Sequence, residues 1–440
     1  DNTLPSIIFG AATDETIDGG AGDNTIFGLG GDDIIIGGTD SLASRDINNT
    51  IDIEDLEDQT ESDDGNDALY GGDGNDTIMG GQGDDLLDGG DGDDVMSGQA
   101  GIDVFRGGAG SDTVDFSRES PFQLIVNLET NFANGGTASG DTFYSIEGLI
   151  GSDDRIDRFI GTSAANHFIG QGGGDVFNGR AGNDTLDGGN DGDVLYGEEG
   201  DDVIIGGAGQ DYLDGGEGTD VVVYRDSSSG VTVDLANGTA TGGDATGPVQ
   251  IVGRGTAIEH DILVGFENVE GSCYDDWLIG DSQMNALSGG AGADTLTGGE
   301  AADLLDGGAG SDTADYSDAT SGVILNLHRD VSEGDTLVSI ENLSGSGEDD
   351  RLTGDTSANV LTGQGGDDTL RGSGGDDTLL GDFADQGDTL TTPGLGTGYA
   401  TLGADATNNS IATAYDISDN FSLPEDPNIF DSTTVLHTTV

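Results

Sequence analysis

The chain is dominated by a nine-residue unit that recurs head to tail. Residues 107–115 read GGAGSDTVD, residues 71–79 read GGDGNDTIM and residues 206–214 read GGAGQDYLD. A full unit has glycine at its first, second and fourth positions, aspartate at its sixth and an apolar residue at its eighth. A fixed short period of this kind indicates a solenoid, in which each turn packs only against its neighbours.

The spacing within the unit predicts a loop followed by a strand. Glycine tolerates positive φ, so the first six residues can curl and direct their carbonyl groups toward one point. The last three residues form a minimal strand whose middle side chain points opposite to its neighbours, into a thin core. Two units, or eighteen residues, then complete one coil. This register stacks Asp67 on Asp85 and Asp103, and Asp76 on Asp94 and Asp112.

Such a coil needs more than its core to fold. Fixing nine backbone residues costs roughly 9–18 kcal/mol, whereas burying one Leu, Ile or Val contributes only about 1.5–3 kcal/mol. Stacked aspartates also repel one another. A divalent cation reverses that repulsion, and calcium takes six to eight oxygen ligands from carboxylates and backbone carbonyls. The sequence therefore predicts an all-β parallel β-roll, in several consecutive blocks, that folds on binding many Ca²⁺ ions between stacked loops.

The repeat resembles that of the RTX (repeats-in-toxin) family, the haemolysin-type calcium-binding nonapeptide proteins of Gram-negative bacteria. The resemblance implies one calcium ion between each stacked pair of loops, held by carbonyls of both loops and by both aspartates. It also implies type I secretion and an extracellular or cell-surface location. The predicted metal residues are the sixth-position aspartates Asp33, Asp67, Asp76, Asp85, Asp94, Asp103, Asp112, Asp175, Asp184, Asp193, Asp202, Asp211, Asp220, Asp276, Asp294, Asp303, Asp312, Asp350, Asp368 and Asp377, with the loop glycines Gly71, Gly72, Gly74, Gly80, Gly81, Gly83, Gly89, Gly90, Gly92, Gly107, Gly108, Gly110, Gly206, Gly207, Gly209, Gly289, Gly290 and Gly292.

The repeat phase is interrupted several times. Three β insertions share one plan: an aromatic residue (Phe116, Tyr224 or Tyr316) after the last strand, a two-part β segment, and a return strand such as SIENLSGS. We expect the aromatics to cover the core and the insertions to form wider coils that continue the same ladder, or alternatively to wedge it apart. The predicted organisation is RTX coils at 1–38, 63–115, 151–223, 271–315 and 345–388, an acidic insertion at 39–62, β insertions at 116–150, 224–270 and 316–344, a linker at 389–405, and the start of a possible β-sandwich at 406–440.

The C-terminal residues 406–440 resemble the opening strands of a bacterial pre-peptidase-type C-terminal domain. A whole sandwich needs about 100 residues, so we expect this one to be cut short. The chain also opens without an initiating Met, and we expect it to be a fragment or a processed form of something longer.

Several units depart from the consensus. Asn24 replaces the aspartate of the first full unit and should weaken that site. Asn166, Asn285 and Asn359 do so after each insertion, which predicts coils without a strong calcium site of their own, or alternatively an asparagine ladder.

Two further departures affect the fourth-position glycine, which Asp191 and Ala301 replace. Alanine resists the left-handed conformation, so we expect the loop at Asp303 to be perturbed.

Composition narrows the possible partners. The chain has 440 residues and a net charge of −76, with 87 acidic and 11 basic residues, which argues against nucleic acid and anionic membranes as partners. Intrinsic disorder or a halophilic surface would also account for an acidic composition, but neither explains why the acidic residues recur every nine residues. Cys273 is alone, so no internal disulfide forms, and we expect it to be buried. No apolar run approaches the roughly 20 residues of a membrane span.

The sequence carries no recognisable catalytic constellation. It has no HExxH or GxSxG motif, and its histidines, His167, His260, His328 and His437, are scattered. We therefore predict that the chain is not an enzyme. The first hypothesis is a rigid, rod-like structural segment of a large secreted protein, in a surface layer, adhesin or extracellular fibre, with self-association as a possibility. The alternatives are a secretion and folding module for an enzyme whose catalytic domain lies elsewhere, and an extracellular calcium buffer.

Overall fold

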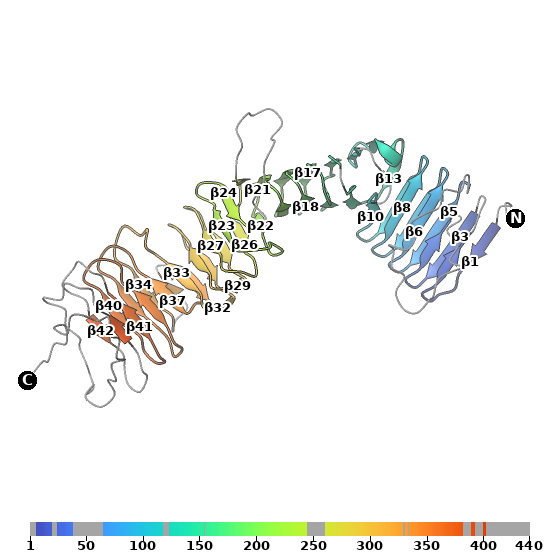
Figure 1. Ribbon diagram of the computed structural model, residues 1–440. Helices are drawn as coiled ribbons and strands as arrows, with labels where there is room; N and C mark the ends of the chain where they lie inside the picture. The colour runs from blue at the N-terminus through green and yellow to red at the C-terminus, as the bar shows by residue number, and fades with distance from the viewer. Residues whose placement is uncertain are drawn as a thin grey trace, which may run out of the picture. The chain divides into compact units, whose positions relative to one another are not determined.

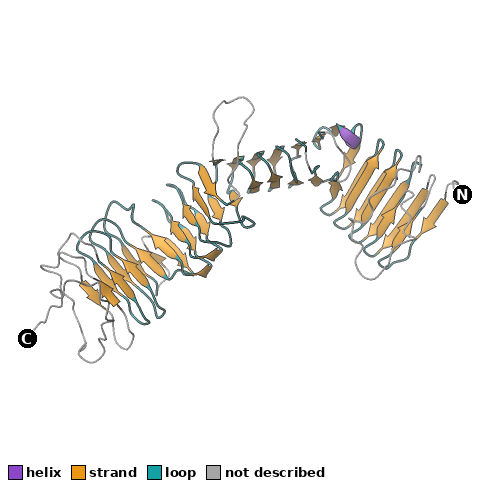
Figure 2. Cartoon of the chain, in the orientation of Figure 1, coloured by secondary structure: helices purple, strands orange, loops and turns teal. Residues whose placement is uncertain are grey.

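The computed structural model describes residues 6–19, 24–37, 65–117, 123–153, 155–243, 260–328, 331–332, 334–381, 389–391 and 399–401. These form two compact units. The first comprises residues Asp1–Tyr224 and Thr239–Phe266, and the second comprises Arg225–Gly238 and Glu267–Val440. Figure 2 shows that the described chain consists of strands and connecting loops, with one short 3₁₀ helix, η3 (Gly136–Ala138), in the first unit.

The first unit is a solenoid whose strands stack in columns on its faces (Figure 1). One column runs β1-β3-β5-β7-β9-β13, and a second runs β2-β4-β6-β8-β10-β14-β16-β18-β20-β22. A third, β12-β11-β15-β17-β19-β21-β25-β24, takes over from the first. The strands are β1 (Ser6–Phe9), β2 (Thr16–Asp18), β3 (Asn24–Gly30), β4 (Ile34–Ile36), β5 (Ala68–Asp73), β6 (Thr77–Gln82), β7 (Leu86–Asp91), β8 (Val95–Ala100), β9 (Val104–Ala109), β10 (Thr113–Asp115), β11 (Ile125–Asn127), β12 (Phe132–Asn134), β13 (Thr142–Tyr144), β14 (Gly148–Ile150), β15 (Arg158–Ile160), β16 (His167–Ile169), β17 (Val176–Ala181), β18 (Thr185–Asn190), β19 (Val194–Glu199), β20 (Val203–Ala208), β21 (Tyr212–Glu217), β22 (Val221–Val223), β24 (Thr239–Gly242) and β25 (Asp261–Val264).

The second unit repeats this plan. Its columns are β26-β28-β31-β36-β35, β23-β27-β30-β33-β37-β39-β41-β43 and β34-β38-β40-β42, with the short pair β29-β32 beside them. The strands are β23 (Val231–Asp234), β26 (Asn268–Glu270), β27 (Trp277–Ile279), β28 (Ala286–Ser288), β29 (Ala291–Gly292), β30 (Thr295–Thr297), β31 (Leu304–Asp306), β32 (Ala309–Gly310), β33 (Thr313–Asp315), β34 (Ile324–Asn326), β35 (Val331–Ser332), β36 (Asp335–Val338), β37 (Asn342–Ser344), β38 (Arg351–Thr353), β39 (Val360–Thr362), β40 (Thr369–Arg371), β41 (Thr378–Leu380), β42 (Thr389–Thr391) and β43 (Tyr399–Thr401).

The predicted eighteen-residue register is confirmed. In the first unit β5 pairs in parallel with β7, aligning Leu69 with Leu87, and in the second unit β28 pairs with β31, aligning Leu287 with Leu305. The eighth-position side chains point inward and form the core, as the strand periodicity requires. Leu69, Leu87 and Leu305 are all 0% exposed. The all-β parallel roll predicted from the sequence is therefore the fold.

Many strands are longer than the three residues that the sequence predicted. In the regular blocks of the first unit they span six residues, because the glycines that open the next unit continue the pairing. Gly72 aligns with Gly90 and Asp73 with Asp91, for example. The first residues of the predicted loop are therefore part of the strand, and they continue the pairing between coils.

The first and third insertions continue the ladder on one face and interrupt it on the other. In the first insertion β14 pairs with β10 and β16, so this column is unbroken. On the other face β13 pairs with β9, but β15 pairs with β11, whose antiparallel partner is β12. In the third insertion β37 pairs with β33 and β39, while the pairs β35·β36 and β34·β38 break the other face. Both readings of the insertions therefore hold, each for a different face.

The three aromatics that begin the insertions are buried. Phe116 packs edge-on against Phe105 and Phe143, with ring centroids 6.4 and 6.3 Å apart. The hydroxyl of Tyr224 donates to Oδ2 of Asp261 (2.8 Å), and that of Tyr316 donates to Oδ2 of Asp335 (2.7 Å). These residues thus cover the core and, in two cases, also satisfy a buried carboxylate.

Some sequence predictions need correction. Cys273 is exposed, not buried, because it lies in the loop before β27, where only Ser272 and Asp276 turn inward. Strands β42 and β43 fall within the expected linker 389–405, where they pair with β40 and β41 and so extend the ladder. The acidic insertion 39–62, the segment 406–440 and His437 lie outside the described residues. None of the described helices is both long and apolar enough to cross a membrane.

The inward column should carry most of the packing energy. Leu304 and Leu305 are neighbours in β31, but Leu304 is 42% exposed and Leu305 is 0% exposed. We expect Leu305→Ala to lower the free energy of unfolding by about 2–5 kcal/mol in saturating calcium, and Leu304→Ala to change it by less than about 0.5 kcal/mol. Denaturant titration of both variants tests this, and equal losses would contradict the inward assignment.

Candidate metal centre

The sixth-position aspartates form hydrogen-bonded ladders along the coils. The backbone N–H of Asp67 donates to Oδ1 of Asp85, and that of Asp85 donates to Oδ1 of Asp103, both at 2.8 Å. The spacing is kept in the second block, where Asp184 donates to Asp202 at 2.7 Å and Asp202 to Asp220 at 2.8 Å. The predicted stacking of carboxylates eighteen residues apart is therefore confirmed.

All twenty predicted aspartates occupy this position. Each is buried, and each accepts at Oδ1 a backbone N–H from the coil before it. They are Asp33, Asp67, Asp76, Asp85, Asp94, Asp103, Asp112, Asp175, Asp184, Asp193, Asp202, Asp211, Asp220, Asp276, Asp294, Asp303, Asp312, Asp350, Asp368 and Asp377.

The second carboxylate oxygen distinguishes two groups among these aspartates. In the larger group Oδ2 is buried and, within the described part of the chain, has no hydrogen-bond donor. A buried carboxylate oxygen without a donor is strongly unfavourable unless a cation neutralises it. The aspartates with such an oxygen are Asp33, Asp76, Asp94, Asp103, Asp112, Asp175, Asp184, Asp193, Asp202, Asp211, Asp294, Asp303 and Asp312.

The two groups of aspartates also differ in whether the second residue of the loop is left-handed. Before Asp76, Gly72 has φ +122°, and before Asp184 the second residue, Arg180, is left-handed as well, at φ +83°. In loops where the second residue is not left-handed, its N–H donates to the sixth-position side chain, as Thr162 does to Oδ1 of Asn166 at 2.8 Å. The left-handed turn therefore goes with a carboxylate oxygen that the backbone leaves unsatisfied.

The absence of a side chain on the first glycine of the loop lets this oxygen approach the backbone closely. A Cβ placed on Gly71 would collide with Oδ2 of Asp76 and would lie 2.5 Å from the carbonyl oxygen of Gly89 in the next coil. On Gly170 it would collide with Oδ2 of Asp175 and with the carbonyl oxygen of Gly188. The carboxylate oxygen therefore lies close to a carbonyl oxygen of the next coil, so oxygens of two successive coils meet beside this glycine. The predicted loop glycines at the second position are all left-handed: Gly72, Gly81, Gly90, Gly108, Gly207 and Gly290. Those at the first and fourth positions are Gly71, Gly74, Gly80, Gly83, Gly89, Gly92, Gly107, Gly110, Gly206, Gly209, Gly289 and Gly292.

The donor set fits calcium. It combines carboxylate and backbone carbonyl oxygens, the ligands that a hard cation of this size prefers. Among the described residues no three His, Cys, Asp or Glu side chains converge as a metal cluster, so main-chain carbonyls must complete each site. The ion would supply the positive charge that the backbone does not provide. Held between stacked loops, the carboxylates would orient it and tie successive coils together.

Burial makes the aspartates hard to ionise without a cation. Desolvation raises the pKa of Asp103 to about 7, that of Asp175 to about 9 and that of Asp193 to about 10. Neighbouring carboxylates in the ladder raise it further. In Asp193, for instance, Asp211 and Asp175 add to the effect of burial. A nearby divalent ion would reverse this shift because an opposite charge favours the ionised form.

The second group of sixth-position residues is saturated by protein donors. Oδ2 of Asp276 accepts the N–H of Ser272 (2.5 Å), and its Oδ1 accepts the serine hydroxyl (2.9 Å). Asp350 receives the same two bonds from Ser346, at 2.6 and 2.8 Å. Both were predicted as metal ligands, but their hydrogen bonds give them less need of an ion than the aspartates of the first group have. A Gly-Ser begins each of these loops, but it is no reliable sequence signal, because Gly372-Ser373 begins the loop of Asp377 with Ser373 left-handed at φ +73°.

The asparagines at the junctions do not stack into an asparagine ladder. Each lies between neighbours of other types. Asn166 accepts the N–H of Thr162 at Oδ1 (2.8 Å) and donates from Nδ2 to the carbonyl of Glu147 (3.1 Å). The amide of Asn166 thus supplies its own acceptor and donor, and the absence of a strong calcium site from these coils stays a prediction.

The two fourth-position substitutions leave the ladder intact. Asp191 is left-handed, with φ +73°, a conformation that Asp tolerates better than most residues. Ala301 avoids positive φ, yet Asp303 is 3% exposed and accepts the N–H of Asn285 at 2.9 Å. Alanine thus resists the left-handed conformation as predicted, but the effect does not reach Asp303, whose ladder bond is kept.

Sequence reasoning missed four ladder aspartates in or beside the insertions. Asp141, Asp261 and Asp335 accept the N–H of Asp103, Asp211 and Asp303, and Asp157 accepts that of Leu124. They lack the preceding glycines of the full unit. The remaining signal was an aspartate two residues before an apolar residue, as in DTF, DIL and DTL.

Comparison with known proteins identifies the repeat. The chain matches the profile of the RTX calcium-binding nonapeptide repeat (4 copies) over residues 9–41, 61–96, 88–118, 152–186, 187–222, 279–314 and 344–379, more than half of its length. The chain belongs to this family. Its repeats bind Ca²⁺, so this RTX chain is a calcium-binding repeat protein. No curated protein matches it.

A solved structure also resembles the RTX chain. It is described as a hyperactive, Ca²⁺-dependent, beta-helical antifreeze protein from an Antarctic bacterium. The two are 16% identical over 86% of this chain and 83% of that chain, with a TM-score of 0.17. A score this low carries no argument about what this chain does.

The ladder assignment can be tested at one position. Asp94 is 0% exposed, and its Oδ2 has no donor within the described chain, whereas Asp91 in the same block is exposed. We expect Asp94→Asn to reduce the number of calcium ions bound, with a loss of about 2.7 kcal/mol of stability per lost ion at 100 times its Kd. Asp91→Asn should leave both unchanged. Calorimetric calcium titration measures this, and equal behaviour of the two variants would contradict the assignment.

The raised pKa values of the buried aspartates predict that the calcium-free protein becomes more stable as the pH falls. A folded-state pKa of about 6 to 10, above the ordinary 3.8, means that the folded chain binds more protons than the unfolded chain. Its contribution to stability is full below about pH 4 and is lost as pH rises through the folded pKa values. We expect calcium-free chain to gain β structure on acidification from about pH 8 to about pH 5, by circular dichroism. Repeating this in 1 M salt, which screens surface charge, isolates the buried groups, and no gain there would contradict the prediction.

Proposed function

We propose that the chain is a structural segment of a large secreted RTX protein that folds on calcium outside the cell. In this proposal it provides stiff calcium-loaded rolls to a surface layer, adhesin or extracellular fibre of a Gram-negative bacterium. Its partners are calcium and copies of itself, and it has no catalytic role. The observation that carries the proposal is the column of buried carboxylates, such as Asp76 and Asp94, whose Oδ2 atoms have no donor among the described residues.

Electrostatics supports a calcium-controlled fold. The net charge of −76 and the pairing of buried aspartates oppose compaction when no cation is present. Calcium removes both obstacles, so its binding energy becomes folding energy. A chain that stays open at low cytosolic calcium and folds at millimolar calcium would suit export through a narrow channel followed by folding outside.

The blocks of repeats would act as separate calcium arrays. We propose rolls at 63–115, 151–223, 271–315 and 345–388, preceded by the coils of 1–38 and separated by the β insertions. Support comes from the junction coils, where Asn166, Asn285 and Asn359 satisfy their neighbours by hydrogen bonds alone. Each array would then begin and end at coils that need less calcium.

Calcium titration of the purified chain tests the proposal. Starting from chelated protein, we expect a cooperative gain of far-UV β signal near millimolar calcium, with little effect of magnesium because it demands a smaller octahedral site. A chain that is already β-rich and heat-stable in excess chelator would contradict it.

Assembly distinguishes a structural segment from a module that only assists export. Electron microscopy and light scattering with and without calcium should show calcium-dependent fibres or sheets if the chain builds a surface structure. Folded monomers at all concentrations would instead favour a secretion and folding module attached to a catalytic domain elsewhere.

A further inference from the structure

Two insertions return to the roll through a loop that ends in a glutamate where the ladder expects an aspartate. The backbone N–H of Asp112 donates to Oε2 of Glu147 at 3.1 Å, and that of Asp312 donates to Oε2 of Glu341 at 2.9 Å. The ladder therefore continues from repeat aspartates onto glutamates that lie outside the matched repeats.

The return loop is shorter than a repeat loop, which explains the longer side chain. The inward residues on either side of it, Phe143 in β13 and Leu149 in β14, lie six residues apart, against nine in a repeat such as Leu69 and Ile78. Ser145 is left-handed, at φ +50°, and Ser339 has the same value in the equivalent loop. The N–H groups of Glu147 and Gly148 both reach the carbonyl of Asp112, at 3.0 and 2.8 Å. The short loop holds the backbone close to the roll, and glutamate's extra methylene lets its carboxylate meet the Asp112 N–H.

The same kinds of oxygen meet at this position as in a repeat loop. A Cβ on Gly107 would collide with Oδ2 of Asp112 and with the carbonyl oxygen of Ser145, just as one on Gly170 would with Asp175 and Gly188. Asp112 is 0% exposed, and its Oδ2 has no hydrogen-bond donor in the described chain. The buried oxygen is thus directed at the return loop, where no N–H meets it.

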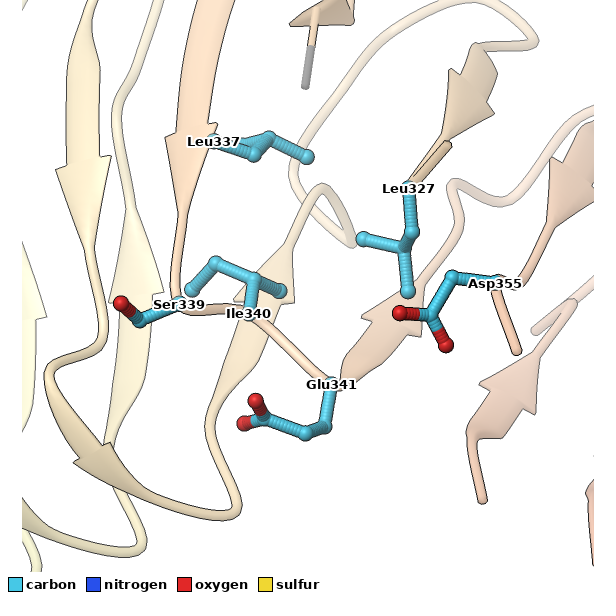
Figure 3. A pocket seen from close by; sticks show the side chains of 6 residues that line it. All are labelled: Leu327, Leu337, Ser339, Ile340, Glu341 and Asp355. Carbon is cyan, nitrogen blue, oxygen red and sulfur yellow. The ribbon is translucent and has the colours of Figure 1, made fainter. Parts of the chain in front are cut away.

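The equivalent place in the second unit has the same features. Asp312 is 0% exposed with an unpartnered Oδ2 among the described residues, and a Cβ on Gly307 would collide with the carbonyl oxygen of Ser339. A small hollow adjoins Glu341, lined by Leu327, Leu337, Ser339, Ile340, Glu341 and Asp355. Figure 3 shows Ser339 and Glu341 on one segment of its wall, with Asp355 on a neighbouring segment. Solvent and ions can therefore reach the glutamate.

We propose that a calcium site of a second type closes each of these rolls, held by Asp112, Glu147 and the carbonyl of Ser145 in the first unit and by Asp312, Glu341 and the carbonyl of Ser339 in the second. The next coil cannot extend the array, because Asn166 and Asn359 donate from Nδ2 to the carbonyls of Glu147 and Glu341, at 3.1 and 2.8 Å. An amide donor occupies the side on which the next ion would lie. These glutamate sites are the last in their arrays.

Replacing the glutamates by glutamine tests this, since glutamine keeps an oxygen that can accept the N–H of Asp112 or Asp312 and loses only the charge. In the full chain we expect Glu147→Gln and Glu341→Gln each to bind about one calcium ion fewer, and the double variant about two fewer. The exposed residues Glu129 and Glu300 give matched controls, Glu129→Gln and Glu300→Gln, which should bind the wild-type number. Equilibrium dialysis with radioactive calcium and native mass spectrometry give the counts.

The outcomes separate this inference from the proposed function on which it rests. Wild-type counts in folded glutamine variants would overturn the glutamate sites and leave the repeat sites standing, whereas wild-type protein that folds without calcium would overturn the proposed function itself. If a glutamine variant does not fold, Glu147→Asp is measured instead, because it keeps the charge and shortens the reach. Folding of this variant that recovers at higher calcium supports the site, and folding that calcium does not improve overturns it.

Discussion

Repulsion between buried carboxylates is the constraint on which this structure depends. Stacking coils at an eighteen-residue interval gives continuous strand pairing and an inward column of apolar side chains, but it also places the sixth-position aspartates above one another. The backbone satisfies one oxygen of each, as in the bond from Asp76 to Asp94. The other oxygen faces carbonyls of the next coil. Desolvating a charge without a partner costs several kcal/mol, so we expect folding and cation binding to be coupled.

The loops also show what the chain does where no ion is needed. At the junctions the second residue of the loop donates its N–H to the sixth-position side chain, as Thr162 does to Asn166. In some of these loops a serine hydroxyl adds a second hydrogen bond, as Ser272 does to Asp276. In the repeats several second residues are left-handed although they are not glycine, among them Leu29, Gln99, Glu198 and Gln364. That conformation costs about 1–2 kcal/mol for such residues. Pairing between coils offsets part of it, as in the alignment of Arg180 with Glu198, and an ion held by the turn would offset more.

Repeat period and side-chain chemistry were enough to predict the regular part of the fold. The eighteen-residue coil, the buried eighth-position side chains and the stacking of Asp67 on Asp85 needed only the repeat and the alternation of a strand. The sequence alone did not distinguish Asp276 and Asp350 from other ladder aspartates, because their difference lies in whether one N–H points at the carboxylate. Asp141, Asp261 and Asp335 escaped notice because the ladder bond, not the glycine-rich loop, positions them. The burial of Cys273 was misjudged because a loop residue next to inward-facing neighbours can still turn outward.

The ladder of carboxylates also explains where the insertions occur. An array of calcium sites must stop somewhere, and a last aspartate facing a coil without an anion or an ion would leave its Oδ2 buried and unpaired. Glu147 and Glu341 carry the carboxylate pattern one coil further, and Asn166 and Asn359 then replace charge by amide hydrogen bonds. One face of the solenoid keeps its strand pairing through this transition, as β10, β14 and β16 do. The other face is free to insert a hairpin, so the chain changes its electrostatics and its shape at the same coil without breaking the core.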